Sequence, residues 1–281
     1  MNKNFKVIGY PIGHSMSPFI HKELFALKNI EAEYDKLEIA PENLGRDFEA
    51  ELKKLDGFNI TIPHKVAIID FLDQMDEIAA EYGAVNTVAR RDGKYYGYNT
   101  DAYGFLKGLE FSNIPLCGKV LVYGFGGAAR TILTECIKAG CEVYVGTLPE
   151  FLENAAAVIS EIEQKAAGRI KLLSNEQITE KFDLLVNATP VGMFPKVGVS
   201  PLTAEQVDLF DCVYDIVYNP QETELLKIAK EKGKACGGGL SMLVCQAEQA
   251  HTIWYGAEFS REETERVIAR SAKEMEEVFG K

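Results

Sequence analysis

The stretch Lys119-Val-Leu-Val-Tyr-Gly-Phe-Gly-Gly-Ala-Ala-Arg130 decides the fold of this chain. Its first five residues form an apolar run typical of a buried strand, and a helical pattern follows, which Gly140 ends. The spacing Gly-x-Gly-x-x-Ala between a strand and a helix is typical of dinucleotide-binding folds. The glycines permit a tight turn, and the helix N-terminus offers free N–H groups to a pyrophosphate. We therefore expect a dinucleotide to bind at these residues: Gly124, Gly126, Gly127, Ala128, Ala129 and Arg130.

Strand and helix patterns alternate on both sides of this loop, which predicts βαβ units and a largely parallel sheet. From the loop onward, strands are expected at 142–145, 182–187 and 212–216, and helices at 127–139, 154–167 and 222–232. Before it, strands are expected at 5–9, 34–38 and 57–61, a hairpin at 84–98, and helices at 17–28, 44–55, 65–72 and 78–82. Two amphipathic helices, at 240–257 and 261–279, complete the pattern.

The length of 281 residues is more than one hydrophobic core needs and suits two domains. We expect an α/β protein whose N-terminal, open and mostly parallel domain covers 1–102 and is completed by the helices of 240–281. A doubly wound, Rossmann-like domain is expected over 103–239. Ser17 is expected to be a helix N-cap, with Pro18 at the first helical position, and Ser260 and Glu263 have the spacing of a capping box.

Composition limits the partners and the compartment. A formal net charge of −12 argues against nucleic acid and anionic membranes as partners, but a few local donors can still bind a small anion. No apolar stretch approaches the roughly 20 residues of a membrane helix, and the N-terminus enters a strand at once, so no signal peptide is expected. The six cysteines form no CxxC pair and have no histidine at metal-ligand spacing, which indicates free thiols in the cytoplasm and no metal site.

Polar residues gather in four short clusters, each of which ends a predicted strand or opens a predicted helix. Pockets form at such places in open α/β sheets. The clusters supply small hydroxyls, amides, one lysine and one aspartate, which suit a polyhydroxylated carboxylate better than an apolar ligand. They are Ser15-Met-Ser17-Pro18, Asn59-Ile-Thr61-Ile-Pro-His64-Lys65, Gly83-Ala-Val-Asn86-Thr87 and Asn99-Thr-Asp101.

In this order the clusters, the glycine loop and three later motifs resemble the shikimate dehydrogenase family from about Gly9 to Ala247. The later motifs are Asn187-Ala-Thr189, Tyr214-Asp-Ile216-Val-Tyr218 and Gly239-Leu-Ser-Met-Leu-Val-Cys-Gln246. The resemblance implies reversible, nicotinamide-dependent reduction of 3-dehydroshikimate to shikimate in chorismate and aromatic amino acid biosynthesis, by a monomer or a homodimer.

The same resemblance implies a role for individual residues. Ser15 and Ser17 would hold the substrate carboxylate, with Tyr218 nearby. Ile216 and Gly239 would flank the nicotinamide, and Thr147 and Thr189 would belong to the cofactor site. The residues expected to contact the ring hydroxyls are Thr61, Lys65, Asn86, Asp101 and Gln246.

The chemistry of the reaction agrees with this assignment. Reducing a ring ketone requires one hydride and one proton delivered to the oxygen, and a lysine at hydrogen-bond distance supplies such a proton. Lys65 and Asp101 are therefore the expected catalytic pair. The residues leave open whether Lys65 acts alone or the pair acts together.

The end of the second nucleotide-binding strand leaves the cofactor open. The common family pattern there is Asn-Arg-Thr, whose arginine grips the 2′-phosphate of NADP, whereas this chain has Gly146, Thr147 and Leu148. NADP is the family default, and NAD or dual use stays open.

Two other functions remain open. The first is a quinate/shikimate dehydrogenase that prefers NAD. The second is a non-catalytic dinucleotide-sensing regulator, against which the intact Lys65 and Asp101 argue.

Overall fold

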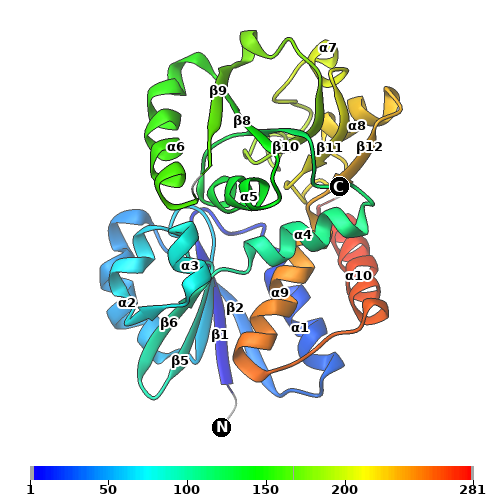
Figure 1. The fold of residues 1–281 in the computed structure, drawn as a ribbon. Helices are drawn as coiled ribbons and strands as arrows, with labels where there is room; N and C mark the ends of the chain where they lie inside the picture. The colour runs from blue at the N-terminus through cyan, green and yellow to red at the C-terminus, as the bar shows by residue number, and fades with distance from the viewer. Residues whose placement is uncertain (1–2, 167, 280–281) are drawn as a thin grey trace. The chain divides into compact units, whose positions relative to one another are not determined.

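The computed structural model describes residues 3–166 and 168–279. Their contacts divide them into two compact units, each built around its own six-stranded sheet (Figure 1). The first unit contains the residues up to Asp101 together with Val244–Val278, and the second contains Ala102–Leu243 and Phe279. The first unit is therefore discontinuous in sequence, because the last two helices return to it.

The first unit has a mixed sheet in the order β2-β1-β3-β5-β6-β4. Strand β1 is parallel to both β2 and β3, whereas β5 is antiparallel to β3 and β6. The strands are β1 (Lys3–Gly9), β2 (Ala32–Glu38), β3 (Gly57–Ile60), β4 (Gln74–Met75), β5 (Thr87–Arg91) and β6 (Lys94–Tyr98). The helices are α1 (Ser17–Leu27), α2 (Leu44–Ala50), α3 (Glu77–Tyr82), α9 (Leu240–Tyr255, in this unit from Val244) and α10 (Arg261–Phe279), with 3₁₀ turns at Pro41–Asn43, Leu52–Lys54 and Ala67–Phe71.

Successive side chains of β1 face opposite sides of this sheet, as the pleat of a strand requires. Phe5 packs on Phe25 of α1 and on Trp254 of α9. Ile8, on the other side, belongs to a core that includes Phe48 of α2. Buried apolar layers on both faces hold the sheet rigid, so the loops at its edge start from fixed positions.

The topology brings the four polar clusters to one edge of this sheet. Strands β1, β3 and β6 run in one direction and end at Gly9, Ile60 and Tyr98, and antiparallel β5 starts at Thr87 on the same edge. The residues that follow or precede these ends include Lys65 and Asp101. The edge expected to bind substrate is therefore assembled by strand direction alone.

The second unit has an entirely parallel sheet in the order β12-β11-β10-β7-β8-β9. Counted within the unit, this is the 3-2-1-4-5-6 order of Rossmann folds, with its switch point between β7 and β10. The strands are β7 (Lys119–Tyr123), β8 (Glu142–Thr147), β9 (Ile170–Ser174), β10 (Phe182–Asn187), β11 (Phe210–Asp215) and β12 (Ala235–Gly238). The helices are α4 (Asp101–Phe111), α5 (Gly127–Lys138), α6 (Leu152–Ala166), α7 (Ala204–Val207) and α8 (Glu224–Glu231), with 3₁₀ turns at Pro149–Phe151 and Asn175–Gln177. The predicted doubly wound fold is confirmed.

Alternation along β7 again supplies two cores. Val120 and Val122 pack with Ile132 of α5, whereas Leu121 on the opposite face packs with Leu225 of α8. An all-parallel strand buried on both faces is expected to be a continuous apolar run, as β7 is. This arrangement leaves the carboxyl end of β7 as the start of the glycine loop.

Several predicted elements differ from the observed ones. The expected helix at 65–72 is only the 3₁₀ turn Ala67–Phe71, because the Lys65 carbonyl accepts a hydrogen bond from the Val85 N–H at 2.8 Å and so leaves the helical pattern. The N-cap of α1 is Met16, and Ser17 is the first helical residue without a side-chain cap, so the predicted capping role of Ser17 was wrong. The expected helix at 44–55 breaks at Glu51. Residue 167, the end of another predicted helix, lies outside the described residues.

Candidate active site

A buried ion pair joins two of the polar clusters. The Lys65 ammonium lies 2.6 Å from Asp101 Oδ2, and the two side chains are 12% and 1% exposed. Lys65 follows the β3 edge and Asp101 follows β6, so the pair bridges two strand ends that are far apart in sequence. An ammonium has three donor positions, and Asp101 uses one of them. The predicted pair is therefore assembled with donor capacity left for a ligand.

Asn86 holds the other oxygen of this aspartate. Its amide nitrogen donates to Asp101 Oδ1 at 3.0 Å and to the Thr100 hydroxyl at 3.0 Å. Its amide oxygen accepts from the Thr100 N–H at 2.8 Å and from the Thr87 hydroxyl at 3.1 Å. Both ends of the amide are fixed, so Asn86 sets the orientation of the carboxylate that binds Lys65.

Hydrogen bonds of three neighbouring residues fix the backbone around the pair. Asn99 accepts a hydrogen bond from the Asp101 N–H at 2.9 Å and donates to the Ala84 carbonyl at 2.9 Å, so it caps the turn that leads into Asp101. His64 is buried, and its Nε2 lies 2.6 Å from the Ile39 carbonyl, which gives it a structural contact. The half-buried Thr61 is tied through its N–H to the Ile8 carbonyl of β1 at 2.9 Å.

Ser15 and Ser17 lie together at the start of α1. The Ser17 N–H donates to the Ser15 hydroxyl at 3.2 Å, and both residues are half-buried. The loop before them is held by β2, because the Ile12 N–H donates to a Glu38 carboxylate oxygen at 3.0 Å and Lys36 Nζ donates to the Gly13 carbonyl at 2.6 Å. Gln246, also half-buried, comes from α9 of the same unit.

The second unit places the glycine loop at the switch point of its sheet. Gly124 has φ +110°, and a Cβ there would lie 2.8 Å from Thr189 Cγ2, so only glycine fits between the ends of β7 and β10. Gly126 is the N-cap of α5 without a side-chain cap, and a Cβ on it would meet no atom within 4 Å. Open space and free N–H groups at the start of a 12-residue helix fit the phosphates of a dinucleotide.

Backbone contact also joins Ile216 to Gly239. A Cβ at Gly239 would lie 2.1 Å from the Ile216 carbonyl oxygen, and the Gly239 N–H donates to the Val217 carbonyl at 3.2 Å. The loop is anchored by Asp215, which accepts from the Val217 N–H at 3.0 Å and from the Thr223 hydroxyl at 2.7 Å. Burial raises the pKa of Asp215 to about 6. Tyr218, half-buried, lies on the same loop.

The end of β8 offers little to a 2′-phosphate. Gly146 pairs with Tyr123, whose ring would lie 2.8 Å from a Cβ at position 146, so the ring takes the space of a side chain there. Thr147 is 4% exposed and so buried in the structure. Arg130, at the first turn of α5, donates to a Glu161 carboxylate oxygen at 2.7 Å. The arginine of the glycine loop is therefore engaged by a carboxylate.

Comparison with known proteins agrees with this geometry. The profile of the shikimate dehydrogenase substrate binding domain matches residues 7–88. A shikimate dehydrogenase (NADP(+)) from Shouchella clausii (strain KSM-K16) is 38% identical over 273 residues, which cover 95% of this chain and 98% of that protein. The chain belongs to the shikimate dehydrogenase family.

Solved structures of the family share its fold. A shikimate 5-dehydrogenase from Thermus thermophilus, in complex with NADP(H) and shikimate, has a TM-score of 0.84 at 34% identity and covers 96% of this chain and 99% of that one. Another from Listeria monocytogenes, in complex with shikimate and NAD, has a TM-score of 0.80 at 30% identity and covers 95% and 96%. Both nicotinamide dinucleotides are thus found in relatives that match nearly the whole chain.

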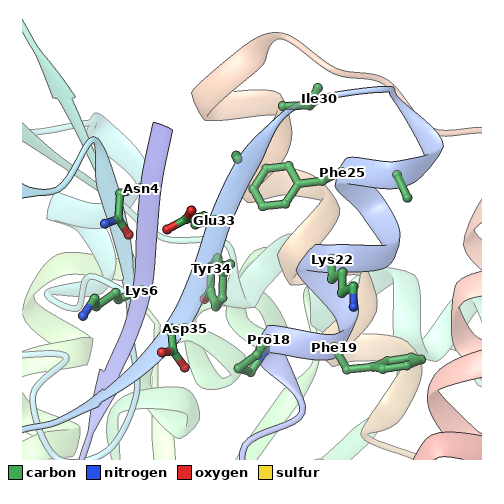
Figure 2. Close-up of a pocket in the computed structure, with 12 residues that line it drawn as sticks. Asn4, Lys6, Pro18, Phe19, Lys22, Phe25, Ile30, Glu33, Tyr34 and Asp35 are labelled. Atoms are coloured by element: carbon green, nitrogen blue, oxygen red, sulfur yellow. The ribbon is translucent and has the colours of Figure 1, made fainter. Parts of the chain in front are cut away.

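A cavity of about 690 Å³ lies away from the ion pair, between α1 and β2 (Figure 2). Its lining includes Lys6, Lys22, Phe25 and Tyr34. Neither Lys65 nor Asp101 lines this cavity, so it is not the place where the two side chains would meet a substrate.

Some polar partners in the site were not predicted from the sequence. Tyr34, Thr87 and Thr100 join the hydrogen bonds around Asn86, directly or through Asn59. Thr87 and Thr100 stand beside predicted residues, so their proximity in sequence was a usable signal. Tyr34 lies in a strand whose alternation suggests only a solvated edge, and nothing in the sequence marks it.

In the described part of the chain, no helix could span a membrane. Nor do three or more metal-ligating side chains gather there.

Proposed function

We propose that this chain is a shikimate dehydrogenase that catalyses the reversible, NADP-dependent reduction of 3-dehydroshikimate to shikimate in chorismate and aromatic amino acid biosynthesis. The observation that carries the proposal is the Lys65–Asp101 pair, buried and braced by Asn86 at the edge where four polar clusters meet. The first unit is the substrate domain and the second is the dinucleotide domain. The match of the substrate-binding profile to residues 7–88 of the first unit supports this division.

Each polar cluster has a part in binding the substrate. The hydroxyls of Ser15 and Ser17 hold the carboxylate, together with Tyr218. Proximity of the two serines at the start of α1 supports this role. The ring hydroxyls are held by Thr61, Lys65, Asn86, Asp101 and Gln246.

Lys65 carries the proton and Asp101 orients it. Lys65 gives a proton to the ketone oxygen in the reducing direction and takes it from the hydroxyl in the oxidising direction. Both Asp101 oxygens accept hydrogen bonds, from Lys65 and from Asn86, so the carboxylate serves as a fixed acceptor. This geometry supports the pair, acting together, as the catalytic unit.

The glycine loop holds the cofactor. The nicotinamide dinucleotide, when bound, supplies or accepts the hydride. Gly124–Arg130 and Thr189 would hold its phosphates, and Ile216 and Gly239 would flank its nicotinamide. The open space at Gly126 and the uncapped start of α5 support this placement. Because Arg130 binds Glu161 and no arginine follows β8 at 146–150, the grip on a 2′-phosphate is weak.

The compartment and the assembly are also proposals. The enzyme acts in the cytoplasm, as a monomer or a homodimer, and its partner is the small anionic substrate. All six cysteines are free, two of them buried, which suits a reducing compartment.

One assay tests the activity and the cofactor together. The purified chain is offered shikimate or quinate with NADP or NAD, and the absorbance of the reduced nicotinamide is followed. We expect turnover of shikimate with NADP, and a preference for NADP over NAD of less than about 100-fold because no arginine fork is present. A larger preference would refute the weak grip. Turnover of quinate but not shikimate would refute the substrate.

The proton role of Lys65 has a direct test. We expect Lys65→Ala to lower kcat by about 100-fold or more, with a modest change in the KM for shikimate, because general acid–base catalysis contributes this much. Lys53→Ala is the control, because Lys53 forms an exposed ion pair with Glu49. A Lys65→Ala enzyme with the kcat of the control would remove Lys65 from the mechanism.

A further inference from the structure

Tyr34, on strand β2, contacts both helix α1 and strand β3. Its hydroxyl donates to the Asn59 amide oxygen at 2.7 Å. Its ring is stacked on His21 of α1, with ring centroids 3.9 Å apart and planes 8° apart. Burial raises the pKa of Tyr34 well above its usual range, and hydrogen bonding with the Ser17 side chain opposes part of that rise. The residue therefore connects α1, through the His21 ring, to Asn59 near the end of β3. The close-up of the cavity shows Tyr34 on β2, with α1 beside that strand (Figure 2).

From Tyr34, hydrogen bonds run in one direction toward the proposed catalytic pair. The Asn59 amide nitrogen donates to the Thr87 hydroxyl at 2.9 Å, and that hydroxyl donates to the Asn86 amide oxygen at 3.1 Å. The Asn86 nitrogen then donates to Asp101. Each hydroxyl in this series has one hydrogen to give, so the donor and acceptor roles of its members are mutually fixed.

Two neighbours of Tyr34 on β2 bind the loop that leads to Ser15. Tyr34, Lys36 and Glu38 alternate along the strand and so share one of its faces. Lys36 binds the Gly13 carbonyl and Glu38 binds the Ile12 N–H, just ahead of Ser15. Lys36 and Glu38 thus fix the backbone of the loop before Ser15. Tyr34, on the same face of β2, binds the Asn59 side chain.

We propose that Tyr34 is a positioning residue of the substrate site, which fixes the orientation of Asn59 and, through Thr87 and Asn86, that of Asp101. The proposal rests on the proposed function, because it takes Asp101 as a substrate-site residue. Tyr34 does not itself carry the proton. Its loss leaves the Asn59 oxygen without its donor and relaxes the hydrogen bonds that lead to Asp101.

Tyr34→Phe removes the hydroxyl and keeps the ring that stacks on His21. The matched control is Tyr95→Phe, because the Tyr95 hydroxyl also donates one hydrogen bond within the first unit, to the Lys53 carbonyl at 3.2 Å, away from the polar clusters. We expect Tyr34→Phe to raise the KM for shikimate about tenfold and to lower kcat several-fold, with an unchanged KM for NADP. Tyr95→Phe leaves all three constants near those of the parent enzyme.

This pattern separates positioning from a loss of folded protein. A smaller folded fraction lowers the apparent kcat and leaves both KM values alone. The two variants are also compared by melting temperature, and we expect them to lose similar stability because each loses the one partly buried hydrogen bond that its phenolic hydroxyl donates. The proposal is overturned if the KM for shikimate of Tyr34→Phe stays within twofold of the Tyr95→Phe value.

A second measurement does not depend on the reaction. In ¹⁵N-labelled protein without ligands, the side-chain amide signal of Asn86, assigned by its loss in Asn86→Asp, reports the hydrogen bonds of that amide. We expect the signal to shift in Tyr34→Phe and to stay in place in Tyr95→Phe. An unchanged signal in Tyr34→Phe overturns the coupling. If the parent enzyme does not oxidise shikimate, the proposed function fails, and this signal still decides whether Tyr34 positions Asn86.

Discussion

Asp101 is an anionic side chain taken almost wholly out of water, and each of its oxygens accepts a hydrogen bond. Removing one partner from a buried ion pair costs several kcal/mol, because it leaves a charge without compensation. The pair is therefore a means of holding one ammonium in one place more than a source of stability. Such a fixed donor is what a proton transfer to a bound ketone needs.

Asp215 is also a buried carboxylate, but its environment differs from that of Asp101. It is buried among neutral hydrogen-bond donors, and burial raises its pKa to about 6 against the opposing hydrogen bonds of Thr223, Val217 and Asn187. Because the folded state then binds a proton that the unfolded state has lost, its contribution to stability is present below about pH 3.8 and falls as the pH rises through 6. The decrease amounts to about 3 kcal/mol at neutral pH.

We expect Asp215→Asn to gain stability relative to the parent as the pH rises from 4 to 7, because the amide does not ionise. Any constant loss from altered hydrogen bonds shifts the whole curve and leaves this slope intact. Melting temperatures across the range measure it. Asp183→Asn is the control, since the exposed Asp183 also accepts a backbone N–H, that of Lys119, at 2.7 Å. Parallel curves for Asp215→Asn and the parent would contradict the raised pKa.

Residue types at strand ends were enough to predict that Lys65 and Asp101 come together, because both lie within polar clusters that the topology brings to one edge. The same reasoning misses Tyr34, whose role depends on a hydrogen bond to Asn59, a residue 25 positions away along the chain. It also assigned Ser17 to a helix cap, since the local pattern does not reveal that its N–H binds Ser15. Contacts that depend on tertiary packing are what the sequence does not predict.

At the scale of elements, helices α1 and α9 are joined by two buried histidines. His21 Nδ1 lies 3.0 Å from His251 Nε2, and aromatic rings, including Phe25 and Trp254, surround both. Burial lowers the pKa of His251 to about 3, and burial and the neighbouring His251 lower that of His21 as well. A single neutral pair, with one donor and one acceptor, therefore connects the helix that begins at Ser17 to the helix that carries Gln246.

This pair should make the fold acid-sensitive. Because the folded pKa of His251 lies below its unfolded value of 6.5, its contribution to stability is full above that value and is lost as the pH falls toward 3. The loss from His251 alone reaches about 2 kcal/mol at pH 5. We expect His251→Gln to have a smaller drop in melting temperature between pH 7 and 5 than the parent, although it is less stable at pH 7. His14→Gln, at an exposed histidine, should follow the parent, and an equal drop in all three would exclude the pair as the cause.

Element prediction succeeded where the apolar period was clear and failed where tertiary contacts decided. Strands β7 and β10 were predicted at their observed bounds, because each is centred on an apolar run, Val120–Tyr123 and Leu184–Val186. Helix α4 was missed, since Gly104 and Gly108 obscure its period. A Cβ at Gly108 would lie 2.0 Å from the Tyr214 hydroxyl, which explains the glycine by packing. Strand β12, Ala-Cys-Gly-Gly, has too little apolar character to stand out.

At the scale of the whole molecule, the chain leaves the first unit at Asp101 and returns to it at Val244. The returning helices bury Val244, Val267 and Met275, and α9 packs through Trp254 and Tyr255 on the face of the first sheet that carries Phe5. The second unit, in contrast, draws both of its cores from one continuous segment that ends at Leu243. The two units therefore depend on the C-terminal segment to very different degrees.

This difference predicts the outcome of a truncation. A chain that ends at Leu243 keeps Met242 in the core of the second unit but loses α10 and all of α9 beyond Leu243. The Phe5 face of the first sheet then keeps the packing of α1 but loses that of Trp254, and large buried side chains cost several kcal/mol each when their packing is lost. We expect hydrogen exchange followed by mass spectrometry to find β7, β8 and β10 protected, as in the full chain, while β1 and β3 exchange rapidly. A chain that ends at Ser260 lacks only α10 and serves as the control. It should retain partial protection of β1, because Trp254 still packs on Phe5. Equal protection of β1 in the shortened and full chains would show that the first unit does not need the returning helices, and unprotected β7 in the shorter chain would show that the second unit is not self-sufficient.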